Sequence, residues 1–161
     1  MKSLQTRIAE RDAVIEYLLQ FVGVRGYWSD ETSEWTGGDD PVFGFDCSGL
    51  MSEAFRSVGW LKSHERLSSG GFLERFKVAE VSEPPCAGDL LVYGAVGANG
   101  RHPYHVAMAI SPLQLVEAGG VSRGIDTDVE AAVKNAFVRR RPINFRQSER
   151  IAILRVWEKV A

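Results

Sequence analysis

The amino-acid sequence predicts an α+β protein in which a group of helices is followed by an antiparallel β-sheet. The first half of the chain carries apolar residues at helical spacing, and the second half carries short strand-like runs separated by glycine and proline turns. Helices that precede strands, instead of alternating with them, are typical of the α+β class. The length of 161 residues leads us to expect a single domain over residues 1–161.

Composition and charge exclude several classes of function. A formal net charge of −2 indicates no strong attraction to nucleic acid or to an anionic membrane. No apolar run has the length of a transmembrane span, and the N-terminus lacks the apolar core of a signal peptide. The cysteines and histidines do not cluster as zinc ligands do, so we expect no metal site and no cofactor.

Helical patterns dominate the first half of the chain. A helix is expected over residues 4–22, because apolar residues recur along one face and Gly23 follows. Residues 23–45 predict a long structured loop, which in a compact domain is usually functional. Residues 63–76 predict a short helical region that is interrupted at Gly70-Gly71.

The best-defined helix begins at Cys47. Asp46 stands at the N-cap position and Gly59 at the C′ position. The apolar residues between them form one stripe, made of Cys47, Leu50, Met51, Ala54, Phe55 and Val58. A cysteine at a helix N-terminus is favoured as thiolate, which makes Cys47 a candidate nucleophile. The alternatives are a small buried core residue and, less favoured, a disulfide with Cys86.

Strand patterns dominate the second half. Strands are expected over residues 89–93, 105–110, 114–118, 137–141 and 151–157, with a helical turn over 126–134. Gly94 is expected to end the first strand, and a glycine-rich loop to run on to Pro103. Arg139-Arg140-Arg141 is interpreted as a solvated strand edge.

The strand at 105–110 carries the candidate base. Alternate residues face opposite sides of a sheet, so His105 shares a face with Ala107 and Ala109 and the other face is apolar core. The two alanines leave room for another element, and we expect the Cys47 helix there, within reach of His105 as general base. His102 is a competing histidine, placed in the expected loop.

Glu117 is the candidate that orients the histidine. A three-residue turn at 111–113 would pair Ala107 with Glu117 and place the carboxylate on the His105 face. From there it could accept the second imidazole N–H. A turn with an even number of residues would place Glu117 on the opposite face.

Four segments resemble the NlpC-type cell-wall peptidases, which are papain-like cysteine endopeptidases of bacteria and their phages. Residues 44–50 resemble the nucleophile motif, 35–41 the aromatic-glycine-glycine approach to it, 87–91 the Pro-Gly-Asp-Leu start of a strand, and 105–110 the histidine strand. The family's third polar residue, commonly His with Asn or Gln as variants, lies about twelve positions after the histidine and corresponds to Glu117.

The resemblance implies a papain-like fold and cleavage of peptidoglycan stem peptides, typically between γ-D-glutamate and a diamino acid. It implies that Cys47 forms an acyl-enzyme, with His105 and Glu117 as its catalytic partners. It also implies that Asp46 and Ser48 contact the amine of the stem peptide. The family's tyrosine before the glycine pair is displaced here, and we expect Tyr27, together with Trp35, to take its substrate-binding place.

Two rival functions remain open from the sequence. One is a non-catalytic phage-tail or cell-wall-binding module of the same fold, with tail or virion proteins as partners. The other is a related thiol amidase or transpeptidase. The N-terminal composition fits a phage-type or dedicated release to the cell wall, and it also fits a cytoplasmic recycling enzyme.

Overall fold

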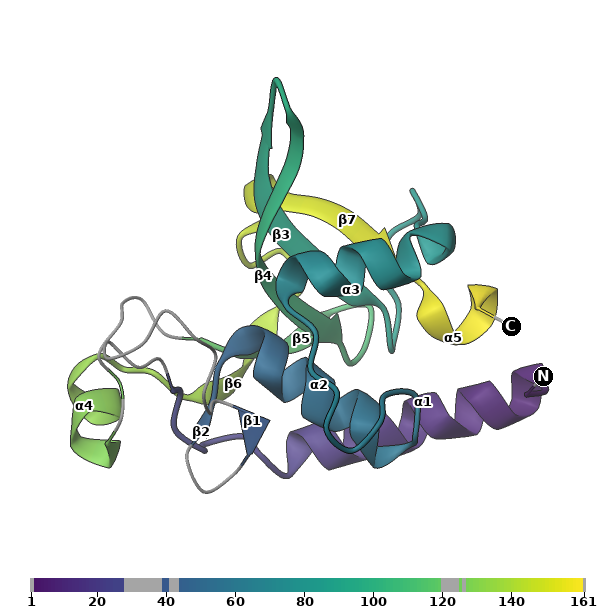
Figure 1. Cartoon of the computed structure of the whole chain (residues 1–161). Coiled ribbons are helices and arrows are strands. Elements are labelled where there is room, and N and C mark those ends of the chain that lie inside the picture. Colours follow the sequence, from purple (N-terminus) through teal and green to yellow (C-terminus); the bar gives the residue numbers. More distant parts are fainter. Residues whose placement is uncertain (1, 28–38, 41–43, 120–124, 126, 161) are drawn as a thin grey trace.

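The computed structural model describes residues 2–27, 39–40, 44–119, 125 and 127–160. Its centre is a five-stranded antiparallel sheet in the order β6-β5-β4-β3-β7 (Figure 1). The strands are β3 (Leu90–Gly97), β4 (Gly100–Ala109), β5 (Gln114–Ala118), β6 (Val138–Pro142) and β7 (Arg150–Leu154). This arrangement of helices and antiparallel strands confirms the predicted α+β class.

Most of the helices precede the sheet, and two short strands were not predicted. The helices are α1 (Leu4–Leu19), α2 (Cys47–Ser57), α3 (Ser69–Phe76), α4 (Asp128–Val133) and α5 (Val156–Lys159), with 3-10 turns at Lys77–Ala79 and Gln147–Glu149. The short strands β1 (Asp39–Asp40) and β2 (Gly44–Phe45) pair with each other just before α2. The last expected strand is shorter than predicted, because Trp157 lies in α5.

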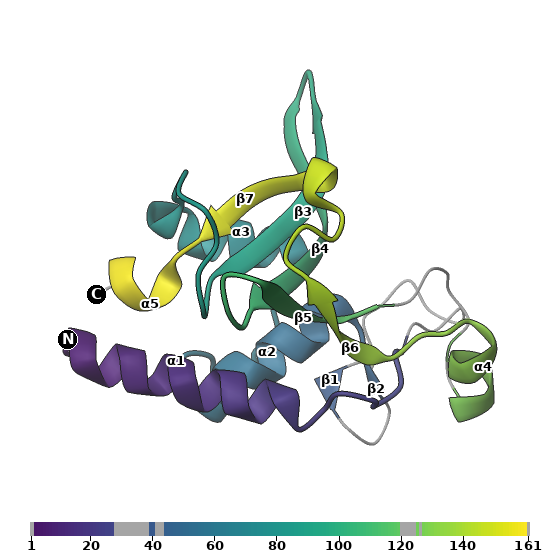
Figure 2. The same cartoon turned by 180° about the vertical axis from the view of Figure 1, so that it is seen from behind.

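The two faces of the sheet carry separate hydrophobic clusters. The larger cluster joins the apolar sides of α1, α2 and α3 to Val106 and Met108 of β4. The smaller cluster lies on the opposite face, where Ala107 and Ala109 pack with the segment between β6 and β7 (Figure 2). That segment contributes Ile143 and Phe145.

The expectation that the alanine face of β4 receives the Cys47 helix is therefore wrong. Helix α2 packs on the face with Val106 and Met108, because these larger side chains complete the main core. The alanines do leave room for another element, as predicted, but that element is the 143–145 segment.

Two glycine-based predictions are also wrong. Helix α3 runs without interruption through Gly70-Gly71, because these glycines fall in its first turn and Ser68 caps it by accepting a hydrogen bond from the Gly71 N–H. Strand β3 does not end at Gly94 but continues to Gly97, opposite a bulge in β4 where Tyr104 is the extra residue. A Cβ on Gly94 would lie 2.3 Å from the His102 carbonyl oxygen, so only glycine fits this close approach.

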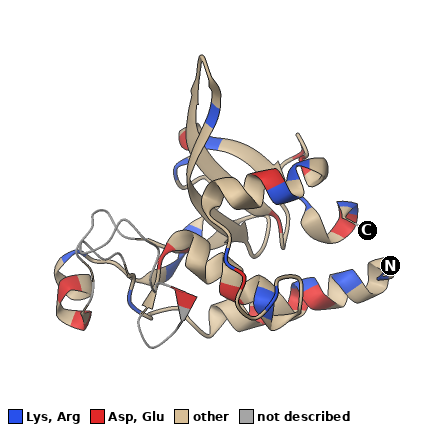
Figure 3. Ribbon diagram, viewed as in Figure 1, with Lys and Arg blue, Asp and Glu red and all other residues tan. Residues whose placement is uncertain are grey.

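Beyond this bulge, β3 and β4 continue as a hairpin that projects beyond the sheet (Figure 1). His102 belongs to this hairpin, where it pairs with Ala95, and not to a loop as predicted. Acidic and basic residues are interspersed along the ribbon (Figure 3). None of the helices that the structure describes has the length and apolar character needed to span a membrane.

Candidate active site

Asp46 fixes the start of α2 and hence the position of Cys47. Its carboxylate accepts a hydrogen bond from the Gly49 N–H at 2.7 Å, as the N-cap prediction requires. Arg66 forms an ion pair with the same carboxylate. Burial raises the pKa of Asp46, and this effect outweighs the opposing charge of Arg66. Gly59 follows the helix with a φ of +74°, as a C′ glycine does.

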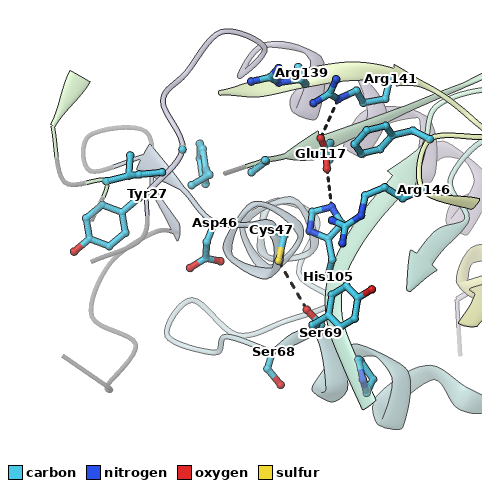
Figure 4. Close-up of a pocket in the computed structure, with 18 of the residues that line it drawn as sticks. Tyr27, Asp46, Cys47, Ser68, Ser69, His105, Glu117, Arg139, Arg141 and Arg146 are labelled. Carbon is cyan, nitrogen blue, oxygen red and sulfur yellow. Dashed lines mark hydrogen bonds and ion pairs between the residues drawn. The ribbon is translucent and has the colours of Figure 1, made fainter. Parts of the chain in front are cut away.

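Cys47, His105 and Glu117 form a linked row (Figure 4). The His105 Nε2 atom lies 2.6 Å from Glu117 Oε2, and the imidazole lies close enough to the Cys47 sulfur for each group to shift the pKa of the other. The Val106 backbone N–H also helps to lower the pKa of Cys47. The start of α2 therefore lies beside His105. The rest of α2 packs on the Val106 and Met108 face of β4, whereas His105 belongs to the opposite face.

The three-residue turn at 111–113 sets the register that brings His105 and Glu117 together. The Ile110 N–H donates to the Gln114 carbonyl, and Met108 pairs with Val116. Glu117 therefore shares a face with His105. His105 pairs with Tyr93 of β3, and the centroids of their two rings lie 5.5 Å apart. This is the register that the odd-numbered turn predicts.

The charges in this row support one another. Burial would raise the pKa of Cys47, but the hydrogen bond and positive charge of His105 outweigh it and lower that pKa. Burial would likewise lower the pKa of His105, yet Cys47 and Glu117 raise it to about 9. Burial opposes ionisation of Glu117, and its contacts with His105 and Arg141 nevertheless lower its pKa. The arrangement favours a thiolate–imidazolium pair at neutral pH.

Glu117 has a second partner that the sequence interpretation missed. Arg141 Nε lies 3.1 Å from Glu117 Oε1, and its guanidinium stacks 4.3 Å from the centre of the Phe145 ring. Arg139 and Arg141 lie on the side of Glu117 away from His105 (Figure 4). Arg139 is the strand partner of Glu117, and Arg141 lies two residues further along β6. Because alternate residues of a strand share a face, pairing these two strands would have placed both arginines on the Glu117 side.

A pocket of about 1000 Å³ opens over the cysteine and histidine. The Ser69 hydroxyl lies 3.8 Å from the Cys47 sulfur at its floor, and the sequence interpretation missed this serine. The signal for it was the Ser68 N-cap, which starts α3 at this point. Described residues from several distant segments complete the lining, among them Tyr27, Asp46, Tyr104, Glu117, Arg139, Arg141 and Arg146.

The other candidate residues are placed as follows. Tyr27 lines the pocket, but its hydroxyl points away from Cys47 (Figure 4). Ser48 is fully buried and donates to Asp46 at 3.3 Å, and it is not among the pocket-lining residues. His102 lies in the exposed hairpin, outside the pocket lining. Trp35 lies outside the described residues.

Neither cysteine forms a disulfide. The Cys86 sulfur lies 3.5 Å from Asp89 Oδ2, and burial and the charge of Asp89 raise the pKa of its thiol. Among the described residues, no cluster of histidine, cysteine and carboxylate side chains could hold a metal ion. The pocket brings together a thiol of lowered pKa, an imidazole of raised pKa and a buried carboxylate.

The family model described as NlpC/P60 matches residues 31–146, which include all three residues of the row. The chain belongs to the NlpC/P60 family. This membership agrees with the resemblance that the cysteine motif and the histidine strand indicated. Comparison with curated protein sequences found no significant match.

Solved NlpC/P60 structures share the fold. The P60 domain of the M. avium subspecies paratuberculosis antigen MAP1204 is 24% identical, with a TM-score of 0.61 over 95% of this chain and 98% of that chain. The Mycobacterium tuberculosis peptidoglycan hydrolase RipB is 24% identical, with a TM-score of 0.56 over 92% of this chain and 67% of that chain.

A Bacillus cereus NlpC/P60 family protein is 23% identical, with a TM-score of 0.61 over 90% of this chain. The chain spans 39% of the length of that protein. These similarities show that the α+β fold seen here is the papain-like fold of the family.

Proposed function

We propose that this NlpC/P60 protein is a cell-wall hydrolase that cleaves peptidoglycan stem peptides by cysteine peptidase chemistry. The observation that carries the proposal is the Cys47–His105–Glu117 row in an open pocket. A buried carboxylate at 2.6 Å holds the imidazole, and the imidazole lowers the pKa of a thiol at a helix start against the opposing effect of burial. Structural relatives described as peptidoglycan hydrolases support the choice of substrate.

In the proposed mechanism the Cys47 thiolate attacks the scissile carbonyl carbon, and the bond to the leaving nitrogen breaks. His105 gives its proton to the leaving amine, which yields an acyl-enzyme on Cys47. The same imidazole then removes a proton from water, which attacks the thioester and regenerates the thiolate. In this mechanism the Cys47 backbone N–H, at the helix start, helps to hold the oxyanion.

The proposed bond lies between the γ-carboxyl of D-glutamate and a diamino acid. Asp46 lines the pocket beside Cys47 and is the candidate for the amine of the stem peptide, together with Tyr27 and Trp35. Ser48, buried beneath Asp46, would act by orienting that carboxylate.

Digestion of purified peptidoglycan of known stem chemistry tests the proposal. The wild-type protein should release fragments whose masses place the cut after γ-D-glutamate. Cys47→Ala should release none, while the matched control Cys86→Ala should retain activity. Products joined to an added amine would instead indicate a transpeptidase, and binding without any cleavage would indicate a non-catalytic module.

A further inference from the structure

Among the described residues that line the candidate active-site pocket, one of the arginines forms no ion pair. Three guanidinium groups line it, from Arg139, Arg141 and Arg146. Arg141 is paired with Glu117 at 3.1 Å. Arg146 is paired with Glu149 at 2.7 Å and lies over the Tyr104 ring.

Arg139 differs from its two neighbours. Its Nε donates to the Phe137 carbonyl at 3.4 Å, and its terminal nitrogen donates to the Asn135 carbonyl. Within the part of the chain that the structure describes, Arg139 forms no ion pair with a carboxylate, and Glu117 acts on it only through its charge at longer range. These carbonyl contacts hold the guanidinium in place without neutralising it.

The nearby negative charges are already committed. Asp46 is paired with Arg66, and Glu117 serves both His105 and Arg141. Burial lowers the pKa of Arg139 and the positive charge of Arg141 lowers it further, and the negative charge of Glu117 offsets these effects only in part. A bound anion would relieve both effects, because an opposite charge stabilises a partly buried cation.

Strand register places Arg139 on the face of the sheet that lines the pocket. Arg139 is the direct β6 partner of Glu117, so the two side chains share the pocket face of the sheet. Arg140, the next residue, has the opposite orientation and is exposed. The chain therefore offers a matched control of the same residue type on the same strand.

We propose that Arg139 binds a free carboxylate of the substrate and makes the pocket selective for acidic over amidated stem peptides. A guanidinium can hold a carboxylate through two parallel hydrogen bonds. A γ-glutamyl linkage leaves the α-carboxylate of glutamate free, and an acidic diamino acid brings a further carboxylate. The inference rests on the proposed function for the identity of the peptide that carries this group.

Hydrolysis of synthetic peptides tests this selectivity. The substrates are L-Ala-γ-D-Glu-diaminopimelate and two analogues, one amidated at the α-carboxyl of D-Glu and one at the side-chain carboxyl of the diamino acid. Arg139→Gln should lower kcat/KM on the acidic peptide roughly 10- to 100-fold, as expected for loss of a charge-assisted hydrogen bond. Arg140→Gln should leave kcat/KM unchanged.

The amidated analogues identify which carboxylate is bound. For the analogue that lacks the bound carboxylate, the kcat/KM of the wild-type protein should fall to the value that Arg139→Gln shows on the acidic peptide. On that same analogue, the wild-type protein and Arg139→Gln should have equal kcat/KM. An equal loss in Arg139→Gln on the acidic peptide and both analogues would overturn the inference while leaving the peptidase proposal standing.

A second readout does not depend on turnover. L-Ala-γ-D-Glu should protect Cys47 from iodoacetamide in the wild-type protein and in Arg140→Gln, and protect it less in Arg139→Gln. Carboxylate-dependent protection without hydrolysis of any peptide would support the subsite and contradict the peptidase proposal. Absence of any carboxylate dependence in both assays would overturn the inference.

Discussion

The Nε2 atom of His105 lies 2.6 Å from the Oε2 atom of Glu117, and only 8% and 2% of the two residues is exposed. A buried carboxylate at this distance fixes one ring nitrogen and stabilises the positive charge of the imidazolium. An amide at this position would make the hydrogen bond without supplying the charge. Substitution of Glu117 can therefore separate the effect of its hydrogen bond to His105 from the effect of its negative charge.

Glu117→Gln should keep the hydrogen bond and shift the pH dependence. The alkaline limb of the activity profile reports deprotonation of His105, whose pKa Cys47 and Glu117 raise to about 9 against the opposing effect of burial. Removing the negative charge lowers that pKa, so the alkaline limb should move to lower pH. Glu117→Ala should lose more activity, about 100-fold, because orientation is lost as well. An unchanged profile in Glu117→Gln would contradict this role.

Iodoacetamide should label Cys47 roughly 10- to 100-fold faster than Cys86 at pH 7. An ordinary thiol is only about 3% ionised at that pH, whereas His105 lowers the pKa of Cys47. Burial and Asp89 raise the pKa of Cys86, which slows its reaction. Peptide mass spectrometry over time measures both rates, and Cys47→Ala should retain only the slow reaction. Equal rates would argue against an activated thiolate.

His105→Ala should lower hydrolysis by about 100-fold or more and slow the labelling of Cys47, because the base and the counter-charge are lost together. His102→Ala should change neither, since His102 lies in the projecting hairpin and outside the pocket lining. The two variants are matched in residue type and strand. Comparable losses in both would remove the support for His105.

Gly119→Ala should disturb the site more than the fold. A Cβ on Gly119 would lie 2.9 Å from Glu117 Oε1, and this carboxylate is held between His105 and Arg141. We expect activity to fall about tenfold or more, because small displacements of catalytic groups are costly, with a change of less than about 1 kcal/mol in the free energy of unfolding. Gly97→Ala, whose Cβ would meet nothing closer than 3.9 Å, is the control. Full activity in Gly119→Ala would show that the carboxylate moves freely.

The parts of the fold that local chemistry determines could be predicted from the sequence. Helix α2 begins after its Asp46 cap and is followed by Gly59 at positive φ, because capping and chain reversal depend on neighbouring residues. Strand β5 has the predicted bounds, and turn length alone placed Glu117 beside His105. These relations involve short stretches of chain, where geometry leaves few alternatives.

Packing between distant segments could not be predicted in the same way. Alternation along β4 separated its two faces correctly, but nothing local distinguished which face α2 covers and which the 143–145 segment covers. The same limit applies to Arg139 and Arg141, interpreted as a solvated edge until the sheet order placed β6 beside β5. Arg66, the partner of Asp46, lies in the predicted helical region 63–76, but the structure places it in a non-helical segment before α3 begins at Ser69.

The turn at 111–113 also determines which length changes this chain can accept. It lies at the surface, where Leu113 is 76% exposed, so one inserted residue would cost the core little. That insertion would nevertheless rotate Glu117 to the face of the sheet opposite His105. Two inserted residues would restore the alternation. Descendants of this chain that keep the same chemistry should therefore gain or lose residues at this turn in pairs.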